Sequence, residues 1–316
     1  MNKNSGIFIT GHRGMVGSGI LRYLKKKNYK NLITIDRKKL DLENQSEVKK
    51  FLKKKKIEIV IHSAAFVGGI KSNTLYKADF ISRNLIMQSN IISGSHEAGI
   101  KELIFMGSSC IYPRDCIQPI KEESFLSGKL EITNRSYAIA KIAGVEMCKS
   151  FNEQYKRNYQ SIMPSNIYGP NDDYDLENSH FIPALIRKIY EAKKKQKKNI
   201  ILWGTGKAKR EVTHVDDIAA GIILLLKRKN NDFLTNIGSG YERTIKDYAK
   251  MISKELGYKG KIIFDKNRYL DGTPRKIVSS KKLRNLGWKA KLNFRRGLKL
   301  TINDFLTNKK YKHIVN

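Results

Sequence analysis

The chain has 316 residues, 40% of them hydrophobic, and a formal net charge of +33 at pH 7. This length and apolar content predict a globular protein of one large or two modest domains. The longest apolar run, residues 219–226, is far shorter than the roughly 20 residues that cross a bilayer, so we expect no membrane partner.

Cysteine usage and the start of the chain indicate a reducing compartment. The cysteines Cys110, Cys116 and Cys148 are odd in number and form no CxxC pair, which argues against a disulfide framework or a zinc site. A predicted strand follows residues 1–5 at once and leaves no room for a secretory leader. We therefore expect a cytoplasmic protein that holds no metal.

The basic charge alone would suggest nucleic acid or an anionic membrane as a partner. However, the lysines recur in short runs at residues 25–27, 53–56 and 193–195, each at the end of a predicted helix, where cations suit the helix dipole. No RNA-recognition aromatic pattern, zinc finger or helix-turn-helix signature accompanies them. We expect no specific nucleic-acid partner, and an RNA-contacting nucleotide-binding protein stays as the non-enzyme alternative.

The first half of the chain alternates short β-branched runs with helical stretches. Strands are predicted near residues 6–10, 32–36, 57–62, 101–106 and 159–163, and long helices at 75–98 and 135–157. This rhythm predicts an α/β fold, a Rossmann-type doubly wound parallel sheet with helices on both faces.

The pattern loosens after residue 170, and further helices are predicted at 181–195, 215–227 and 244–256. We expect a Rossmann domain over residues 1–170, with part of 207–240 packed back onto it. Residues 171–316 are expected to form a smaller C-terminal α/β domain that binds the substrate.

A glycine-rich loop follows the first predicted strand and opens the first helix. The context of strand, GxxGxxG and helix is typical of a dinucleotide site, where a pyrophosphate approaches the helix N-terminus. The residues expected to contact the cofactor here are Gly11, Arg13, Gly14, Met15, Val16 and Gly17.

The end of the second predicted strand gives conflicting signals about the cofactor. Asp36 would bond a ribose 2′-hydroxyl and favour NAD, whereas Arg37 together with Arg13 would pair with the 2′-phosphate of NADP. Because two guanidinium groups outweigh one carboxylate if both reach the phosphate, we expect NADP(H).

Tyr137 and Lys141 are four residues apart on a predicted helix, which puts both on one face. Lys141 would hold the nicotinamide ribose and lower the pKa of Tyr137, and Ser108 would bond the same carbonyl oxygen. Together they predict a general acid for hydride addition to a ketone.

Several segments carry a resemblance to a known family. They are GHRGMVGS (11–18), VGGI (67–70), GSSCIYP (107–113), YAIAKIAG (137–144), SNIYGP (165–170), NSHFIPAL (178–185), HVDD (214–217) and DGTPRK (271–276). Over nearly its whole length, the chain resembles the GDP-L-fucose synthases of the extended short-chain dehydrogenase/reductase family. The resemblance implies 3,5-epimerisation of GDP-4-keto-6-deoxy-D-mannose, followed by NADPH-dependent reduction of its C4 ketone.

The resemblance also implies residue roles. Cys110 would remove and return protons at C3 and C5, with His180 as the partnering acid. If residues 108–110 are extended, the thiol leaves the chain on the same side as Ser108. Further implied contacts with the cofactor are Pro164, Asn166, Ile167 and His180, and with the substrate Lys188, Trp203, Arg210 and Asp271.

Two enzyme alternatives stay open. One is the same site acting on another 4-keto sugar nucleotide, of the GDP-colitose type. The other is a 4-epimerase or 4,6-dehydratase with tightly held NAD, which Asp36 favours but Cys110 and His180 do not. We expect a homodimer, although neither the oligomeric state nor the nucleotide base is specified by the residues.

Overall fold

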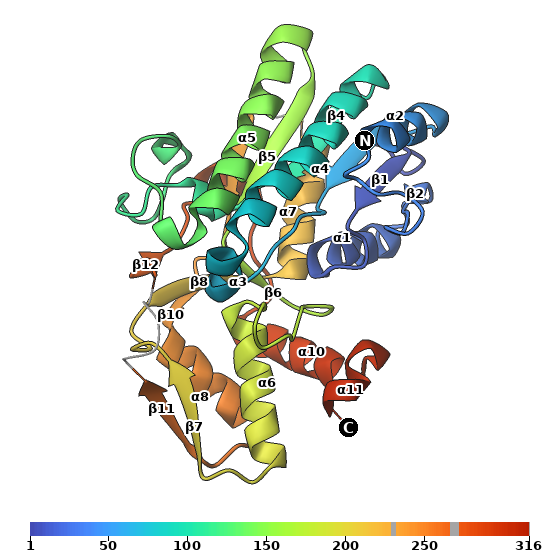
Figure 1. Cartoon of the computed structure of the whole chain (residues 1–316). Helices are drawn as coiled ribbons and strands as arrows, with labels where there is room; N and C mark the ends of the chain where they lie inside the picture. The colour runs from blue at the N-terminus through green and yellow to red at the C-terminus, as the bar shows by residue number, and fades with distance from the viewer. Residues whose placement is uncertain (229–231, 266–271, 316) are drawn as a thin grey trace.

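The computed structural model describes residues 1–228, 232–265 and 272–315 (Figure 1). A six-stranded parallel sheet has the order β2-β1-β3-β4-β5-β9. Its strands are β1 (Ile7–Thr10), β2 (Leu32–Ile33), β3 (Ile59–His62), β4 (Glu102–Met106), β5 (Asn158–Pro164) and β9 (Leu234–Ile237). The order reverses at β1 and β3, as in a Rossmann fold.

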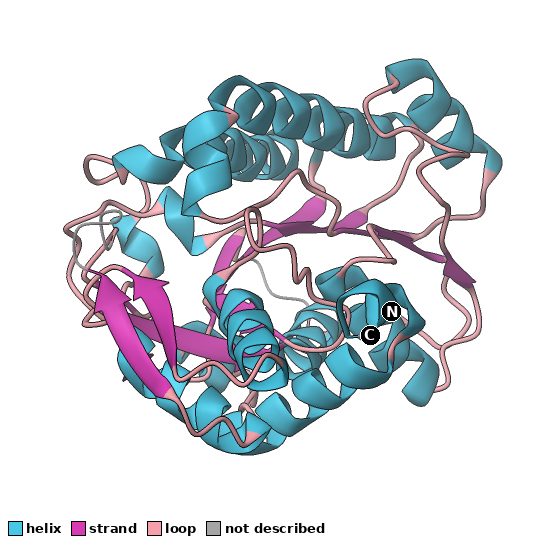
Figure 2. Ribbon diagram, turned by 60° about the horizontal axis from the view of Figure 1, so that its bottom comes forward, coloured by secondary structure: helices cyan, strands magenta, loops and turns pink. Residues whose placement is uncertain are grey.

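Helices cover both faces of this sheet (Figure 2). One face carries α1 (Met15–Lys26) and α7 (Val215–Lys227), which pack together, and the other carries α2 (Gln45–Lys54), α4 (Lys77–Glu97) and α5 (Arg135–Tyr155). The short helix α3 (Ile70–Leu75) precedes α4. Strand β9 pairs with β5, so residues 215–237 belong to this layered body although they follow residue 170.

The alternation of side chains along each strand explains the two layers. Ile7 and Ile9 pack with α1 and α7, whereas Phe8 between them packs with the helices of the opposite face. In β3, Ile61 likewise packs with α1 and α7, and Val60 packs with the helices of the opposite face. Because successive strand residues point to opposite faces, a run of apolar residues is required when both faces are covered.

A second body lies below the sheet in Figure 1. It contains α6 (Phe181–Lys194), α8 (Ile245–Leu256), α10 (Phe294–Thr307) and α11 (Lys312–Val315), with the parallel strands β7 (Asn199–Trp203) and β11 (Lys261–Asp265). Its own hydrophobic core includes Ile186, Leu202 and Phe305. The short helix α9 (Lys281–Asn285) packs against β9 of the main sheet.

A small sheet lies between the two bodies. Strand β8 (Lys209–His214) pairs with β6 (Asn166–Tyr168), β10 (Glu242–Thr244) and β12 (Arg275–Lys276). Because β6 follows β5 directly, this small sheet begins at the carboxyl end of the large one.

The predicted fold class is confirmed, and most element bounds differ by only one or two residues. The largest difference is β2, predicted near 32–36 but observed as Leu32–Ile33. Only Ile7 and Phe8 of β1 pair with it, and a turn closed by the Asp36 carbonyl follows. The domain division at residue 170 stays a prediction.

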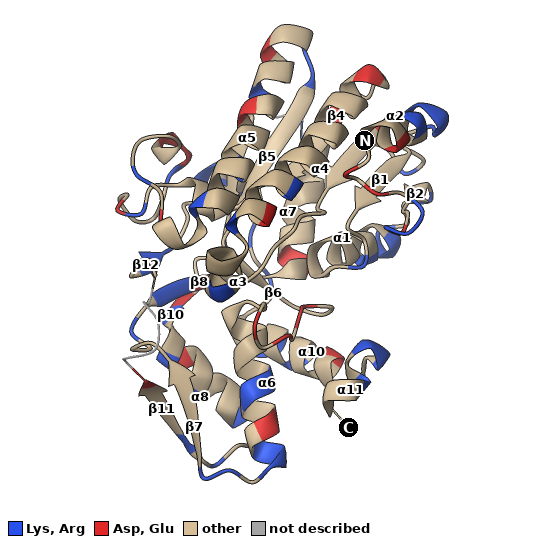
Figure 3. Ribbon diagram, viewed as in Figure 1, with Lys and Arg blue, Asp and Glu red and all other residues tan. Residues whose placement is uncertain are grey.

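The lysine runs lie where the sequence predicts, in the last turns of α1, α2 and α6 (Figure 3). Their ammonium groups therefore lie at the negative ends of these helix dipoles. Within the described ranges, no helix is long and apolar enough to span a bilayer.

Candidate active site

The loop between β1 and α1 leaves its backbone open to a ligand. Gly11 has a φ of +67°, and a Cβ there would lie 2.9 Å from the backbone nitrogen of Ala64. A Cβ on Gly17 would overlap the carbonyl oxygen of Gly11. Gly14 is the N-cap of α1, in an extended conformation without a side-chain cap bond, and Met15 begins the helix.

Because the first turn of α1 carries no acidic residue, its free N–H groups can bind a pyrophosphate. Val16 lies in this turn and packs against the core beneath α1. The glycine loop therefore fits a dinucleotide.

Arg13 and Asp36, the residues that give conflicting predictions about the cofactor, form an ion pair. Arg13 Nη2 donates to Asp36 Oδ2 over 2.6 Å, and His12 Nε2 lies 3.3 Å from Asp36 Oδ1. Arg37 pairs with Glu43 at 3.3 Å. The Arg13 and Arg37 side chains are 77% and 69% exposed, so both guanidinium groups are accessible from solvent.

Tyr137 and Lys141 lie one turn apart on α5, near the carboxyl end of β4. The buried Lys141 donates through Nζ to Met106 O over 2.8 Å, and its Nζ lies 5.7 Å from the centroid of the Tyr137 ring. Gly144 permits this close packing of α5 on β4, because a Cβ there would overlap the ring of Phe105.

Burial dominates the electrostatics of this pair. Burial lowers the pKa of Lys141 to about 7. The pKa of Tyr137 is raised above its ordinary value, first by burial and then by the charge of Cys110. The expectation that Lys141 lowers the Tyr137 pKa is therefore wrong, because the ammonium group is itself desolvated and donates to Met106 O. Tyr137 keeps its proton, which is the state that a general acid requires.

Ser108 and Cys110 leave β4 in a tight turn. Ser108 is the N-cap of the 3-10 helix η1 (Ser109–Ile111), and its Oγ accepts a hydrogen bond from the Cys110 N–H over 3.2 Å. The expected extended segment is therefore wrong, because the serine hydroxyl closes a turn instead. Since η1 packs against α5, the thiol still lies on the Tyr137 side of the sheet.

The half-buried thiol of Cys110 contacts two polar side chains from other segments. Asn134 Nδ2, at the N-cap of α5, lies 3.2 Å from Sγ. Lys276 Nζ, at the end of β12, lies 3.7 Å from Sγ. Residue-by-residue reasoning missed both contacts. The available signals were the position of Asn134 three residues before Tyr137 and the basic end of the DGTPRK segment.

His180 is the exposed N-cap residue of α6, and its side chain makes no capping hydrogen bond. The segment before it is tied to the loop after β3, because Gly69 N–H donates to Asn178 O over 2.7 Å. From this loop α3 begins, and α3 packs against the 3-10 helix η3 (Ile132–Asn134) that ends at Asn134. These contacts link the start of α6, through α3, to the segment that ends at Asn134.

Lys188 and Trp203 form a cation–π pair. Lys188 Nζ lies 4.2 Å from the centroid of the Trp203 ring, and both side chains are half-buried. Burial lowers the pKa of Lys188. Because Lys188 is two turns beyond His180 on α6, one helix carries both residues.

Arg210 lies on β8 beside the start of the DGTPRK segment. A Cβ on Gly272 would be 3.7 Å from Arg210 Nη2. Asp271 lies outside the described residues. The structure thus brings the segment that carries Gly272 to Arg210.

The remaining predicted cofactor contacts follow β5. Pro164 ends β5, and Asn166 and Ile167 form β6. The Asn166 amide donates to Glu211 O over 3.0 Å. Because β4 and β5 are neighbours in a parallel sheet, these residues lie at the same edge as Ser108.

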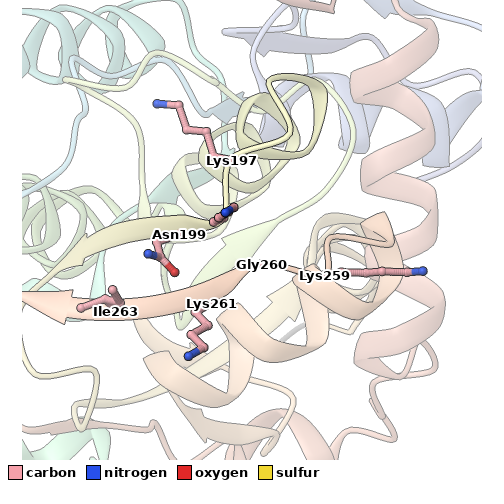
Figure 4. A pocket seen from close by; sticks show the side chains of 7 residues that line it. Lys197, Asn199, Lys259, Gly260, Lys261 and Ile263 are labelled. Carbon is pink, nitrogen blue, oxygen red and sulfur yellow. The ribbon is translucent and has the colours of Figure 1, made fainter.

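A hollow elsewhere on the protein is unrelated to this site (Figure 4). It is lined by Lys197, Lys198, Asn199, Lys259, Gly260, Lys261 and Ile263. It lies at the starts of β7 and β11, whereas Trp203 is at the opposite end of β7. Among the described residues, no group of three or more histidine, cysteine and acidic side chains could hold a metal ion.

Comparison with known proteins identifies the family of the chain. Residues 7–238 match the NAD dependent epimerase/dehydratase family, and the chain belongs to that family. It is 46% identical to a GDP-L-fucose synthase of Sinorhizobium fredii, over 96% of each chain. It is 43% identical to the GDP-L-fucose synthase of Escherichia coli, covering 96% of this chain and 97% of the relative.

A solved structure shares the whole architecture. The GDP-L-fucose synthetase of Naegleria fowleri, bound to NADP, superposes with a TM-score of 0.90 at 26% identity. The match covers 98% of this chain and 96% of that one.

Proposed function

We propose that this protein converts GDP-4-keto-6-deoxy-D-mannose to GDP-L-fucose. The reaction is a 3,5-epimerisation followed by NADPH-dependent reduction of the C4 ketone. The observation that carries the proposal is the convergence of Ser108, Cys110, Tyr137 and Lys141 at the carboxyl end of β4. A carbonyl clamp with a thiol beside it suits a ketone that must be both enolised and reduced.

In the reduction, Tyr137 is the proton donor to the ketone oxygen. Its raised pKa keeps the phenol protonated, and Ser108 supplies a second hydrogen bond to the same oxygen. NADPH, when bound, supplies the hydride. Lys141 would hold the ribose of the cofactor, and its Nζ lies 5.7 Å from the centroid of the Tyr137 ring.

In the epimerisation, Cys110 is the base that removes the protons at C3 and C5. Hydrogens next to a ketone are acidic because the enolate oxygen can be stabilised, here by Ser108 and Tyr137. His180 returns a proton from the other side of the sugar. Its position on α6, separate from the sheet edge that carries Cys110, supports a second proton-transfer group.

The nucleotide-sugar would be held by residues of the second body. Lys188 and Arg210 are the proposed partners of the diphosphate, because cations of this kind bind phosphate oxygens. Trp203 offers an aromatic surface for the sugar nucleotide, and Lys188 already contacts it. Asp271 is a further proposed substrate contact.

NADP is the proposed cofactor. The glycine loop, the accessible Arg13 and Arg37, and the NADP-bound Naegleria relative support it. Further proposed contacts are Asp36, Pro164, Asn166, Ile167 and His180, at the ends of β2 and β5 and at the start of α6.

We propose a cytoplasmic homodimer. All three thiols are free, and a base at Cys110 requires a reduced one. Exposed apolar side chains on the adjacent helices α4 and α5, Ile86 and Ile139, offer a surface for a second copy. Light scattering of the purified protein tests the dimer.

The decisive experiment for the activity is product identification. Purified protein is incubated with GDP-4-keto-6-deoxy-D-mannose and NADPH, and the product is identified by NMR. GDP-L-fucose is expected, and Tyr137→Phe should lower turnover by roughly 10²- to 10⁴-fold while cofactor affinity barely changes. Turnover only with a 3-deoxy-4-keto sugar nucleotide would instead assign the colitose-type reaction.

A further inference from the structure

We propose that Lys276 stabilises the thiolate of Cys110 and that Asn134 aims it, so that these two positioning residues make Cys110 a base. The inference rests on the proposed function and adds to it the groups that act on the base. Both contacts come from segments far from Cys110 in sequence, and Lys276 is 166 residues away.

Lys276 and Asn134 both act as hydrogen-bond donors, and the Cys110 sulfur is the acceptor. Lys276 offers an ammonium 3.7 Å from Sγ, and Asn134 offers an amide N–H 3.2 Å from it. An opposite charge within about 4–6 Å favours the charged form of an ionisable group. Because Cys110 is half-buried, solvent screens this attraction less than at an open surface.

Lys276 is held in place from both sides of its strand. Within β12, Lys276 is paired with Arg210 of β8. Just beyond it, Ile277 N–H donates to Gln118 Oε1 and Val278 N–H donates to Glu211 Oε2, each over 2.9 Å. The lysine is thus anchored to β8 and to the loop after η1.

Asn134 is positioned by the start of α5. It ends η3 and is the N-cap of the helix that carries Tyr137. Its amide Nδ2 lies 3.2 Å from Sγ, whereas its Oδ1, the atom that could cap the helix, accepts no backbone hydrogen bond. The same helix therefore fixes the proton donor of the reduction and one donor to the base.

In the proposed step, the thiolate takes a proton from the carbon beside the ketone, so an S–H bond forms as a C–H bond breaks. The electron pair moves to the ketone oxygen, where Ser108 and Tyr137 hold the enolate. Lys276 keeps its proton throughout and acts only through its charge.

The test measures Cys110 directly and needs no substrate. Full-length protein with Cys116→Ala leaves Cys110 as the accessible thiol, because Cys148 is buried. Its alkylation by iodoacetamide is followed from pH 6 to 10. Lys276→Met should slow alkylation at pH 7 about tenfold, as a one-unit change in a protonation equilibrium would, and the difference should vanish at high pH.

Two controls separate charge from structure. Lys276→Arg should keep the rapid alkylation, and Lys281→Met, at an exposed lysine on α9, should leave it unchanged. Asn134→Ala should slow alkylation by a smaller factor and tests the same thiolate if Lys276→Met does not fold. The proposal is overturned if Lys276→Met or Asn134→Ala alkylates with the parent pH profile, or if Lys276→Arg is as slow as Lys276→Met.

A second readout uses the reaction. With the 4-keto sugar in D₂O, Lys276→Met should lose deuterium exchange at C3 and C5 near pH 7 and regain it at higher pH. If the wild-type protein makes no GDP-L-fucose while the alkylation shift is present, the proposed function fails and the role of Lys276 stands.

Discussion

Arg13 donates to Asp36 over 2.6 Å, so the cation expected to select NADP is bound to the carboxylate expected to select NAD. A 2′-phosphate would have to compete with Asp36 for Arg13, and it would be repelled by the same carboxylate. We therefore expect the preference for NADP or NAD to depend on whether Arg13 stays paired with Asp36 or binds the 2′-phosphate.

The first prediction is therefore that Asp36→Ala sharpens the preference for NADPH. Removing the carboxylate frees Arg13 and removes the repulsion, so the ratio of kcat/KM for NADPH to that for NADH should rise about tenfold, the effect of a charge-assisted hydrogen bond. Arg37→Ala should weaken only the use of NADPH. Equal or better kcat/KM with NADH in the wild-type protein would show that Asp36 dominates.

The second prediction concerns the stability cost of Lys141. Because its pKa is lowered to about 7 in the folded protein, the unfolded chain binds more protons between pH 7 and its ordinary pKa of 10.5. The cost is therefore fully present below pH 7 and fades as the pH rises towards 10.5. Lys141→Met should stabilise the protein by roughly 1–3 kcal/mol at pH 6.5 and by less at pH 9.5.

Urea unfolding of both proteins at the two pH values measures this difference. The same variant should have little reductase activity, because the proposed contact of Lys141 with the cofactor ribose is lost. A Lys141→Met protein that is less stable than wild type at pH 6.5 would contradict the assignment of a desolvated ammonium.

The third prediction concerns the pair Lys188 and Trp203. Lys188→Met should raise KM for the GDP-sugar about tenfold or more and change kcat little, because the proposed phosphate contact, present in both the ground and the transition state, is removed. Lys193→Met, at an exposed lysine on the same helix, is the matched control. A fall in kcat without a change in KM would place Lys188 in the chemistry instead.

The fourth prediction concerns the charge of +33. Lysines spread over several helix ends should retain RNA at low salt through counterion release but should give no base readout. Binding should therefore be lost near physiological ionic strength. Sequence-selective RNA binding at micromolar or tighter Kd in 0.15 M salt would contradict this and favour the RNA-contacting alternative.

Much of this architecture could be predicted because it depends on short sequence patterns within single elements. The glycine loop before α1 and the helix from Arg135 to Tyr155 follow from turn chemistry and from periodic apolar residues. The turn at Cys110 could not be predicted, because it depends on a hydroxyl of Ser108 that accepts a backbone N–H. The contact of Lys276 with Cys110 depends on the pairing of β12 with β8, which no local pattern encodes.

The pKa of Tyr137 also could not be predicted from local sequence. The i,i+4 spacing correctly predicts that Tyr137 and Lys141 share a helix face, but it carries no information about solvent. Burial reverses the expected direction of the Tyr137 pKa shift, because desolvation raises it and the desolvated Lys141 donates to Met106 O.

The last prediction separates the two chemistries, because in the proposed function epimerisation needs Cys110 and His180 whereas reduction needs Tyr137, Lys141 and hydride. In D₂O without usable hydride, wild-type protein should place deuterium at C3 and C5 of the 4-keto sugar, since enolisation needs only the carbonyl clamp and a base. Cys110→Ala should lose that exchange, while Cys116→Ala, the matched control, should retain it.

Offered an already epimerised 4-keto sugar, Cys110→Ala should still reduce it, because Ser108, Tyr137 and Lys141 stay in place. His180→Ala should slow exchange most at the carbon that it reprotonates. NMR of the sugar protons measures both outcomes. If Cys110→Ala exchanges both positions at the wild-type rate, the thiol is not the base of the epimerisation.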